Sequence, residues 1–282
     1  MSRIRTRRAL ARVCSAALLL GLPACGDSAK KEPLPDGVSL LSDQSRLHRQ
    51  DREIYVRIQN KSDKSIHVES FTLTSDRMPT VKWSGDEEIA AGTEADLEYD
   101  MPEGKCGAGF TPTVRLTYRI GDSGHRISTT KADDRYGNIS LALDRDCAES
   151  ALAEAVDLDV GDPAVVGKDR TSVLNLPVTM TPTGKRDDIR FGGFGSTVLF
   201  NQAEGSPADV DIPLSRDPVR LTMKVTPARC DGHALADDKV GRLFDVSVLG
   251  DGIGENASFY LPLSKPQRVA FFDFYHSHCG LD

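Results

Sequence analysis

The spacing of apolar residues from residue 37 onward constrains the fold of this chain more than any other feature. Short runs alternate between apolar and polar residues, as in residues 53–59, where Ile54, Val56 and Ile58 share one face. Alternation with period two is typical of β-strands that bury one face and expose the other. The chain is therefore predicted to be all-β. Similar runs occur at residues 65–74, 95–101, 113–120, 126–130 and 139–143.

Helical periodicity is weak in the same part of the sequence. No comparable stretch keeps the 3.6-residue spacing of an amphipathic helix, and residues 148–156 are expected to form a turn or two at most. Glycine-containing turns, Gly121-Asp122-Ser123-Gly124 and Gly250-Asp251-Gly252, follow predicted strands. Because glycine tolerates the positive φ of tight hairpins, these segments favour strand-to-strand connections.

The second half of the chain repeats the order of the first. In the first half a strand leads to Cys106, a hairpin follows, and a further strand ends at Cys147. In the second half the same order leads to Cys230, and a predicted final strand over residues 269–279 ends at Cys279. Two copies in series predict two tandem immunoglobulin-like β-sandwiches. Chance similarity between two β domains is the alternative.

The first 25 residues have the layout of a bacterial secretory signal. Five arginines precede an apolar run at residues 13–22, and the segment ends in Leu22-Pro23-Ala24-Cys25. A membrane-spanning helix needs about 20 apolar residues, so this run is too short to span the bilayer. The segment therefore predicts export from the cytoplasm.

The residues that end at Cys25 resemble the lipobox of bacterial lipoproteins. The resemblance implies cleavage before Cys25 and acylation of its sulfur, by palmitate or a similar chain. The mature protein would then be anchored by lipid to the extracytoplasmic face of the cell membrane. A signal without lipidation is the alternative, because Pro23 is unusual in a lipobox. Thr6-Arg7-Arg8 is similar to a degraded twin-arginine motif, so the sequence leaves the export route, Sec or Tat, open.

These features divide the chain into four parts: a signal peptide (residues 1–24), the lipidated cysteine with a proline-containing tether (25–36), and two β-sandwich domains (37–148 and 149–282). The formal net charge is −7, and loss of the arginines of the signal leaves the remainder more acidic. Nucleic acids and anionic lipid surfaces attract clusters of lysine and arginine. Neither is therefore expected to be a partner.

Four cysteines lie in the two predicted domains, and outside the cytoplasm they are expected to be oxidised. Four cysteines allow three pairings. The repeat favours Cys106 with Cys147 and Cys230 with Cys279, because each domain then carries one equivalent bridge. Each bridge is expected to stabilise its domain by about 4 kcal/mol at most in the chain-entropy model.

Histidines near the cysteines of the second domain suggest metal binding as an alternative function. His233 follows Cys230 at a Cys-x2-His spacing, and His276 and His278 would share one face of the predicted final strand. Imidazole is a common ligand of copper and zinc. Because the first domain has no histidine at the equivalent positions, the bridge itself does not need them. A disulfide without a metal, and no cofactor, is the preferred interpretation.

Residues 229–241 carry a resemblance to other proteins. The stretch matches the pattern Arg-Cys-Asp-x-His-Ala-x-Ala-acid-Asp-Lys-x-Gly, and is similar to a segment of uncharacterised secreted lipoproteins of actinobacteria. The resemblance covers about a dozen residues and implies no activity. It draws attention to His233, Asp237, Asp238 and Lys239 as a polar constellation.

Catalytic motifs are incomplete in this chain. Gly121-Asp122-Ser123-Gly124 resembles the nucleophile segment of chymotrypsin-like proteases, but His125-Arg126 follow where that family has Gly-Pro. Residues 191–196 are rich in glycine but lead into a predicted strand, unlike a phosphate-binding loop. We therefore predict a non-enzymatic binding or interaction module, whose partner is a protein or another component of the cell envelope.

Overall fold

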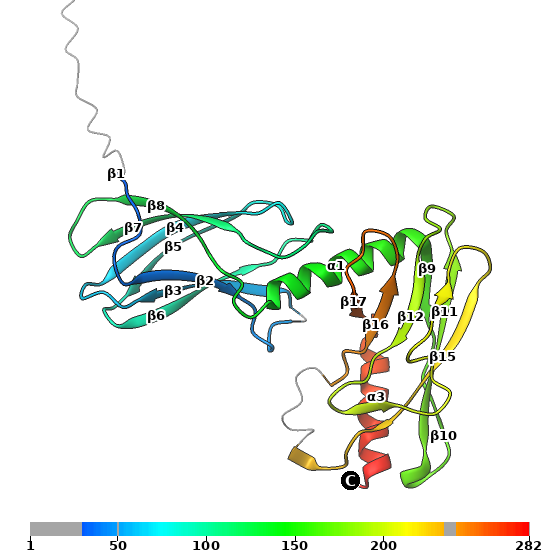
Figure 1. Ribbon diagram of the computed structural model, residues 1–282. Coiled ribbons are helices and arrows are strands. Elements are labelled where there is room, and N and C mark those ends of the chain that lie inside the picture. Colours follow the sequence, from blue (N-terminus) through cyan, green and yellow to red (C-terminus); the bar gives the residue numbers. More distant parts are fainter. Residues whose placement is uncertain (1–29, 50, 234–240, 282) are drawn as a thin grey trace, which may run out of the picture.

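The computed structural model describes residues 30–49, 51–233 and 241–281, which form two β-sandwiches joined by a long helix (Figure 1). Most of the described elements are strands in antiparallel sheets, which confirms the predicted all-β class. Buried apolar residues form two hydrophobic cores, one among residues 40–143 and the other among residues 148–279. The two sandwiches therefore follow each other along the chain.

The first sandwich packs a three-stranded sheet against a five-stranded sheet. The strand orders are β2-β3-β6 and β1-β8-β7-β4-β5. Burial alternates along β3, as period two requires, and Val56 lies opposite Leu97 of β6. The strands are β1 (Lys30–Lys31), β2 (Val38–Asp43), β3 (Glu53–Asn60), β4 (Ile66–Thr74), β5 (Val81–Ile89), β6 (Thr93–Asp100), β7 (Thr113–Ile120) and β8 (Arg126–Lys131).

The second sandwich is built in the same way. One sheet has the order β10-β11-β15-β13, with β9 also paired to β11, and the other has the order β14-β12-β16-β17. The strands are β9 (Val156–Val160), β10 (Ala164–Val166), β11 (Val173–Pro182), β12 (Arg190–Phe194), β13 (Phe200–Gln202), β14 (Ile212–Pro213), β15 (Val219–Pro227), β16 (Asp245–Leu249) and β17 (Ser258–Tyr260), with a short 3-10 helix, η1 (Asp169–Thr171), before β11.

The strand order repeats between the two sandwiches. The order β2-β3-β6 corresponds to β9-β11-β15, and β8-β7-β4-β5 corresponds to β17-β16-β12-β14. This division of the strands between two facing sheets is immunoglobulin-like. In each sandwich the last strand leads to a helix, α1 (Asn138–Ala155) or α3 (Lys265–Cys279), which carries the second cysteine of the predicted pair. The internal repeat therefore extends beyond the strands to these helices.

Two predicted strands are wrong, because residues 139–143 lie in α1 and residues 269–279 lie in α3. The alternation seen in residues 139–143 is too short to separate a strand from one helical turn. Over its full length, α1 buries side chains at helical spacing, and it is much longer than the turn or two predicted for residues 148–156.

The signals that begin and end α3 are local. The Ser264 and Gln267 side chains form a capping box at the start of the helix, and Gly280 ends it with φ of 65°. A capping box satisfies free backbone N–H groups, and glycine adopts the left-handed conformation readily. The aromatic residues of this segment favour strands in general, but here the end signals and the packing of Phe271 and Tyr275 in the core decide the structure.

Both hydrophobic cores include residues of α1. Its first half buries Ile139 and Leu143 in the first core, and its second half buries Ala148, Leu152 and Ala155 in the second. Figure 1 shows one continuous helix running from the first sandwich to the second. The predicted domain boundary at residue 148 thus falls inside a helix of 18 residues. Such a shared helix couples the two sandwiches more firmly than a flexible linker would.

Candidate functional site

The first half of α1 is fastened to the first sandwich at Asp146. The Arg52 guanidinium, in the turn before β3, donates to both Asp146 oxygens, with Nη2 and Oδ2 2.9 Å apart. The Gly104 backbone N–H donates to the same carboxylate at 2.7 Å. The neighbouring Cys106–Cys147 disulfide, with Cα atoms 4.8 Å apart, adds a covalent link. Charge-assisted hydrogen bonds are the stronger kind, so α1 is held here by several bonds at once.

Two shifted pKa values accompany this contact. The hydrogen bond to Asp146 raises the pKa of Arg52 above its ordinary value. Burial raises the pKa of Glu149, one turn further along α1, and the negative charges of Asp146 and Glu103 act in the same direction. Arg52 is thus paired with Asp146, and its positive charge partly opposes the upward shift in the pKa of Glu149.

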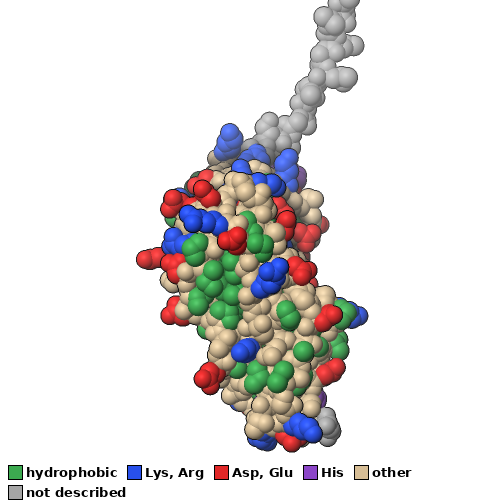
Figure 2. Space-filling view, turned by 90° about the vertical axis from the view of Figure 1, so that its right-hand side faces the viewer, with side chains coloured by type: hydrophobic (Ala, Val, Ile, Leu, Met, Phe, Trp, Pro, Cys, Tyr) green, Lys and Arg blue, Asp and Glu red, His purple; other side chains and the backbone are tan. Residues whose placement is uncertain are grey.

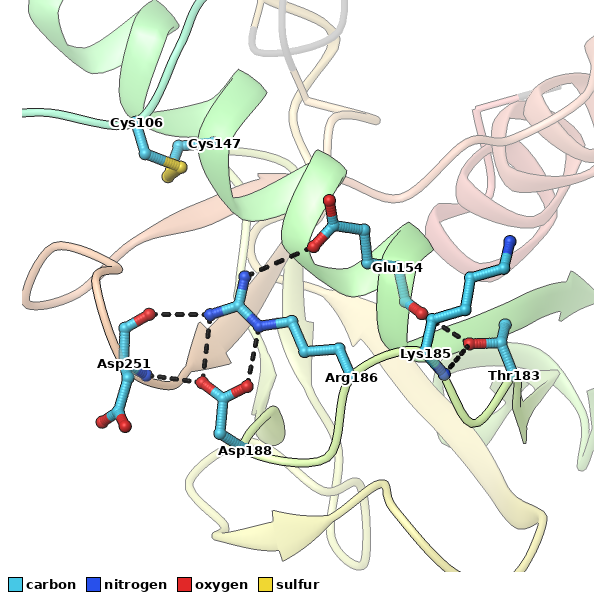
Figure 3. A network of polar contacts seen from close by, with 8 residues as sticks. All are labelled: Cys106, Cys147, Glu154, Thr183, Lys185, Arg186, Asp188 and Asp251. Carbon is cyan, nitrogen blue, oxygen red and sulfur yellow. Dashed lines mark hydrogen bonds and ion pairs between the residues drawn. A yellow bond between two sulfur atoms is a disulfide. The ribbon is translucent and has the colours of Figure 1, made fainter.

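Arg186 fastens the other end of α1 to the second sandwich (Figure 3). Its guanidinium donates to the Asp188 carboxylate at 2.7 Å and to the Asp251 carbonyl at 2.7 Å, and lies 3.7 Å from the Glu154 carboxylate of α1. The hydrogen bond from Arg186 holds the pKa of Asp188 well below its ordinary range. The helix is therefore fixed to both sandwiches by side chains as well as by its buried faces.

A cavity of about 510 Å³ lies beside α1, at the junction of the two sandwiches. The turn between β2 and β3, the helix α1, and the connection from β17 to α3 form its walls. Met101, Leu243, Phe259 and Leu261 give it an apolar side. Small-molecule sites have volumes of roughly 300 to 1,000 Å³ and are common between domains. The cavity therefore has the size and position of a ligand site.

Four arginines line this cavity, namely Arg49, Arg52, Arg145 and Arg268. Arg52 is paired with Asp146, but the other three form no ion pair with any residue that the structure describes. The Arg145 guanidinium carbon lies 4.3 Å from the centre of the Tyr260 ring, and Arg145 Nε is buried with no hydrogen-bond partner among the residues that the structure describes. The cavity thus combines an apolar wall with three arginines that form no ion pair within the described part of the chain.

Both predicted disulfides are confirmed. The S–S distances are 1.95 Å for Cys106–Cys147 and 2.02 Å for Cys230–Cys279. Each bridge joins the loop after an equivalent strand, β6 or β15, to the helix after the last strand of its sandwich. Cys25 lies outside the described residues, so its lipidation stays a prediction.

The three histidines proposed as metal ligands do not form a cluster among the described residues. His276 and His278 are two positions apart on α3 rather than on a strand, so their side chains leave the helix about 200° apart. The His278 Nδ1 is 3.0 Å from the Ser172 hydroxyl, the His276 ring packs on Phe272, and His233 is exposed. Metal binding stays a prediction, without the shared strand face on which it was based.

The segment that carries the actinobacterial resemblance is described only in part. Asp237, Asp238 and Lys239 lie outside the described residues. The start of the segment is tied to α3 by the Cys230–Cys279 disulfide and by the Tyr275 hydroxyl, which donates to the Arg229 carbonyl at 2.6 Å. These contacts give the first residues of the segment a structural role.

Sequence reasoning missed the arginine-lined cavity. Its residues come from separate elements at positions between 44 and 268, and no motif connects them. The one available signal is that Arg145 and Asp146 directly precede Cys147, which the repeat pairs with Cys106.

No helix in the described part of the chain is long and apolar enough to cross a membrane.

The face of the protein in Figure 2 shows acidic and basic side chains interspersed, with hydrophobic side chains gathered in patches between them. A surface of mixed sign does not produce the broad positive field that attracts polyanions.

No protein-family model and no curated protein sequence matches the chain. Among solved structures, red sea bream transglutaminase has a TM-score of 0.24 at 10% identity, and the match covers 82% of this chain and 32% of that one. The calcium-binding domain CBD12 of CALX1.1 has a TM-score of 0.21 at 10% identity, with coverages of 80% and 82%. The chain spans about a third of the transglutaminase, and TM-scores of this size carry no conclusion about function.

Proposed function

We propose that the chain is a non-enzymatic binding protein that is anchored through a lipid on Cys25 to the extracytoplasmic face of the cell membrane. It holds its ligand or partner at the junction of its two sandwiches. The observation that carries this proposal is the cavity beside α1, which both sandwiches line. A cavity between two firmly joined domains is already shaped before a ligand arrives, so binding requires little ordering of the protein.

The proposed location is supported by the N-terminal segment and by the cysteines. The lipobox-like residues before Cys25 and the tether after it fit a protein that projects from a membrane surface. Two disulfides fit an oxidising compartment.

The proposed absence of catalysis is supported by the environment of Ser123. Its hydroxyl accepts a hydrogen bond from the Ile120 backbone N–H at 3.2 Å, within the turn between β7 and β8. The nearby His125 Nδ1 lies 2.7 Å from the carboxylate of Glu69 on β4. A serine nucleophile needs a histidine base within hydrogen-bond reach, whereas this serine has the contacts of a turn residue.

The anchoring part of the proposal is tested with the full chain and a Cys25→Ala variant in a bacterial host fed with labelled palmitate. Label should appear on the wild-type protein, which should partition with detergent, and both properties should be absent from the variant. Label on the variant, or none on the wild type, would contradict anchoring at Cys25.

The binding part is tested by identifying the molecules that remain bound to, or cross-link with, the membrane-anchored chain. Pro262 is exposed and lines the cavity, so Pro262→Trp should fill the cavity and abolish capture, whatever the charge of the ligand. Pro218→Trp, at an exposed position before β15, is the matched control and should capture as the wild type does. Equal capture by both variants, or turnover of a captured molecule, would contradict the proposal.

A further inference from the structure

We infer that the junction cavity binds a small amphipathic anion, whose carboxylate or phosphate group contacts the arginines and whose apolar body lies against the apolar wall. This inference rests on the proposed binding function and specifies the chemical class of its ligand. Three properties of the cavity support it: the net positive charge of its lining, the position of the Arg145 guanidinium, and the apolar residues of its wall.

The local charge is opposite to that of the whole chain. The chain has 42 acidic and 35 basic side chains, yet among the described residues four arginines and two carboxylates, Asp146 and Glu149, line the cavity. Asp146 already accepts hydrogen bonds from Arg52 and from the Gly104 N–H. Positive charges that face one partly enclosed space repel each other and attract an anion. The cavity is therefore cationic within an acidic protein.

Arg145 is positioned to receive an oxyanion. Its guanidinium carbon lies over the Tyr260 ring, 4.3 Å from the ring centre, which places the group between α1 and β17. A guanidinium in contact with an aromatic ring can still donate two N–H groups to the oxygens of a carboxylate or phosphate. The Nε is buried and has no hydrogen-bond partner among the described residues, so an oxyanion in the cavity would bind through the terminal N–H groups of the guanidinium.

The apolar lining of the cavity favours an apolar part in the ligand. Leu243 and Pro262 line the cavity and keep exposed surface, so a bare inorganic anion would leave this apolar surface in contact with water. An adjoining hollow of about 280 Å³ shares Arg145 and Tyr260 with the cavity and continues to the exposed Val198. Apolar burial contributes in proportion to area, so a ligand with an aliphatic or aromatic body satisfies both sides.

The inference is tested by calorimetric titration of the full chain, purified in a non-ionic detergent, with three probes of the same body. These are 4-phenylbutyrate, 4-phenylbutyl phosphate and the uncharged 4-phenylbutanol. At least one anionic probe should bind roughly tenfold to hundredfold more tightly than the alcohol, the range typical of hydrogen bonds to charged groups. Binding of one anion in preference to the other distinguishes a carboxylate from a phosphate ligand.

Variants locate the binding in the cavity. Arg145→Ala should weaken binding of the anionic probe about tenfold or more. Arg49→Ala should also weaken this binding, and it should leave folding unchanged because the Arg49 side chain has no partner among the described residues. Arg115→Ala, at an exposed position on β7, is the control and should bind as the wild type does.

The inference is overturned if the alcohol binds as tightly as the anions, or if both cavity variants bind the anions as well as the control does. If no probe binds although Pro262→Trp abolishes capture from the membrane, the inference fails and the proposed function stands. If Pro262→Trp captures as the wild type does, the proposed function itself fails.

Discussion

At the scale of single residues, His278 shows how burial changes the chemistry of a side chain that the sequence offers as a metal ligand. Its ring is buried beside Phe274, and its Nδ1 lies 3.0 Å from the Ser172 hydroxyl. Burial lowers the pKa of His278 below its ordinary value of 6.5, and the positive charge of Arg170 acts in the same direction, while the contact with Ser172 opposes them. The folded protein therefore holds His278 in its neutral form.

The stability of the second sandwich should consequently depend on the protonation of His278. Because the unfolded chain binds this proton more readily than the folded chain, the contribution of the neutral ring is fully present above about pH 6.5 and is lost as the pH falls toward the folded pKa. We expect the free energy of unfolding of the wild type to fall as the pH is lowered from about 7 to about 5. The His278→Gln variant should lack the part of this fall that His278 causes.

Urea denaturation at several pH values measures this difference. The control is Ser277→Gln, a substitution at an exposed position of the same helix that adds no titratable group. Its free energy of unfolding should depend on pH as that of the wild type does. Parallel curves for the wild type and His278→Gln would contradict the pH dependence assigned to His278.

At the scale of elements, the two helices with cysteines have equivalent positions but different extents. Cys147 lies in the middle of α1, which continues to Ala155, whereas Cys279 is the last residue of α3. The extra turns of α1 carry the side chains that enter the second core. The second copy of the repeat therefore ends in α3, which packs on its own sandwich. The first copy ends in α1, which also joins the second sandwich.

The two disulfides should stabilise their sandwiches by similar amounts. Their sequence separations are 41 and 49 residues, and in the chain-entropy model the cost of closing loops of such similar length is nearly the same. We expect Cys106→Ser/Cys147→Ser and Cys230→Ser/Cys279→Ser each to lower the free energy of unfolding by about 2 to 4 kcal/mol.

Urea denaturation of the two double variants and of the wild type checks this expectation. Thiol titration of the unfolded wild type provides the control, since Cys106, Cys147, Cys230 and Cys279 should not react before reduction. An unchanged unfolding curve for either double variant would show that its bridge does not stabilise the fold.

At the scale of the whole molecule, α1 makes the two sandwiches one mechanical unit. Its two halves are buried in different cores, and Arg52 and Arg186 bind acidic side chains of the helix from the two sides. The junction cavity depends on this arrangement, because its walls come from both sandwiches. A change in the middle of α1 should therefore alter the cavity without removing either core.

Ser150→Pro tests this dependence, since Ser150 is exposed and lies within α1. Proline inside a helix removes a backbone hydrogen bond and costs about 3 kcal/mol or more. We expect the radius of gyration from small-angle X-ray scattering to be larger for this variant than for the wild type. We also expect the wild type to unfold in a single calorimetric transition and the proline variant in two.

Ser150→Ala is the matched control and should keep the scattering curve and the single transition of the wild type, because alanine favours the helix. Circular dichroism should show that the proline variant keeps its β-structure. If its scattering curve equals that of the wild type, α1 does not determine how the two sandwiches are placed.

The sequence by itself determined the features that depend on local order along the chain. Alternation with period two predicts strands, and the repeated order of strands and cysteines was enough to select the two disulfides. It was not enough for residues 139–143 and 269–279, because a few apolar residues fit one face of a strand or of a helix equally well. For α3, that information lies in its capping residues, Ser264, Gln267 and Gly280.

Only the tertiary structure decided where the chain has a candidate site. Arg49, Arg145 and Arg268 are far apart in the sequence, and nothing in their spacing relates them to each other. They line one cavity because α1 enters both cores and holds the turn before β3 near the connection from β17 to α3. Packing brings together residues that are distant along the chain, and for that reason the position and charge of this cavity exist only in the folded molecule.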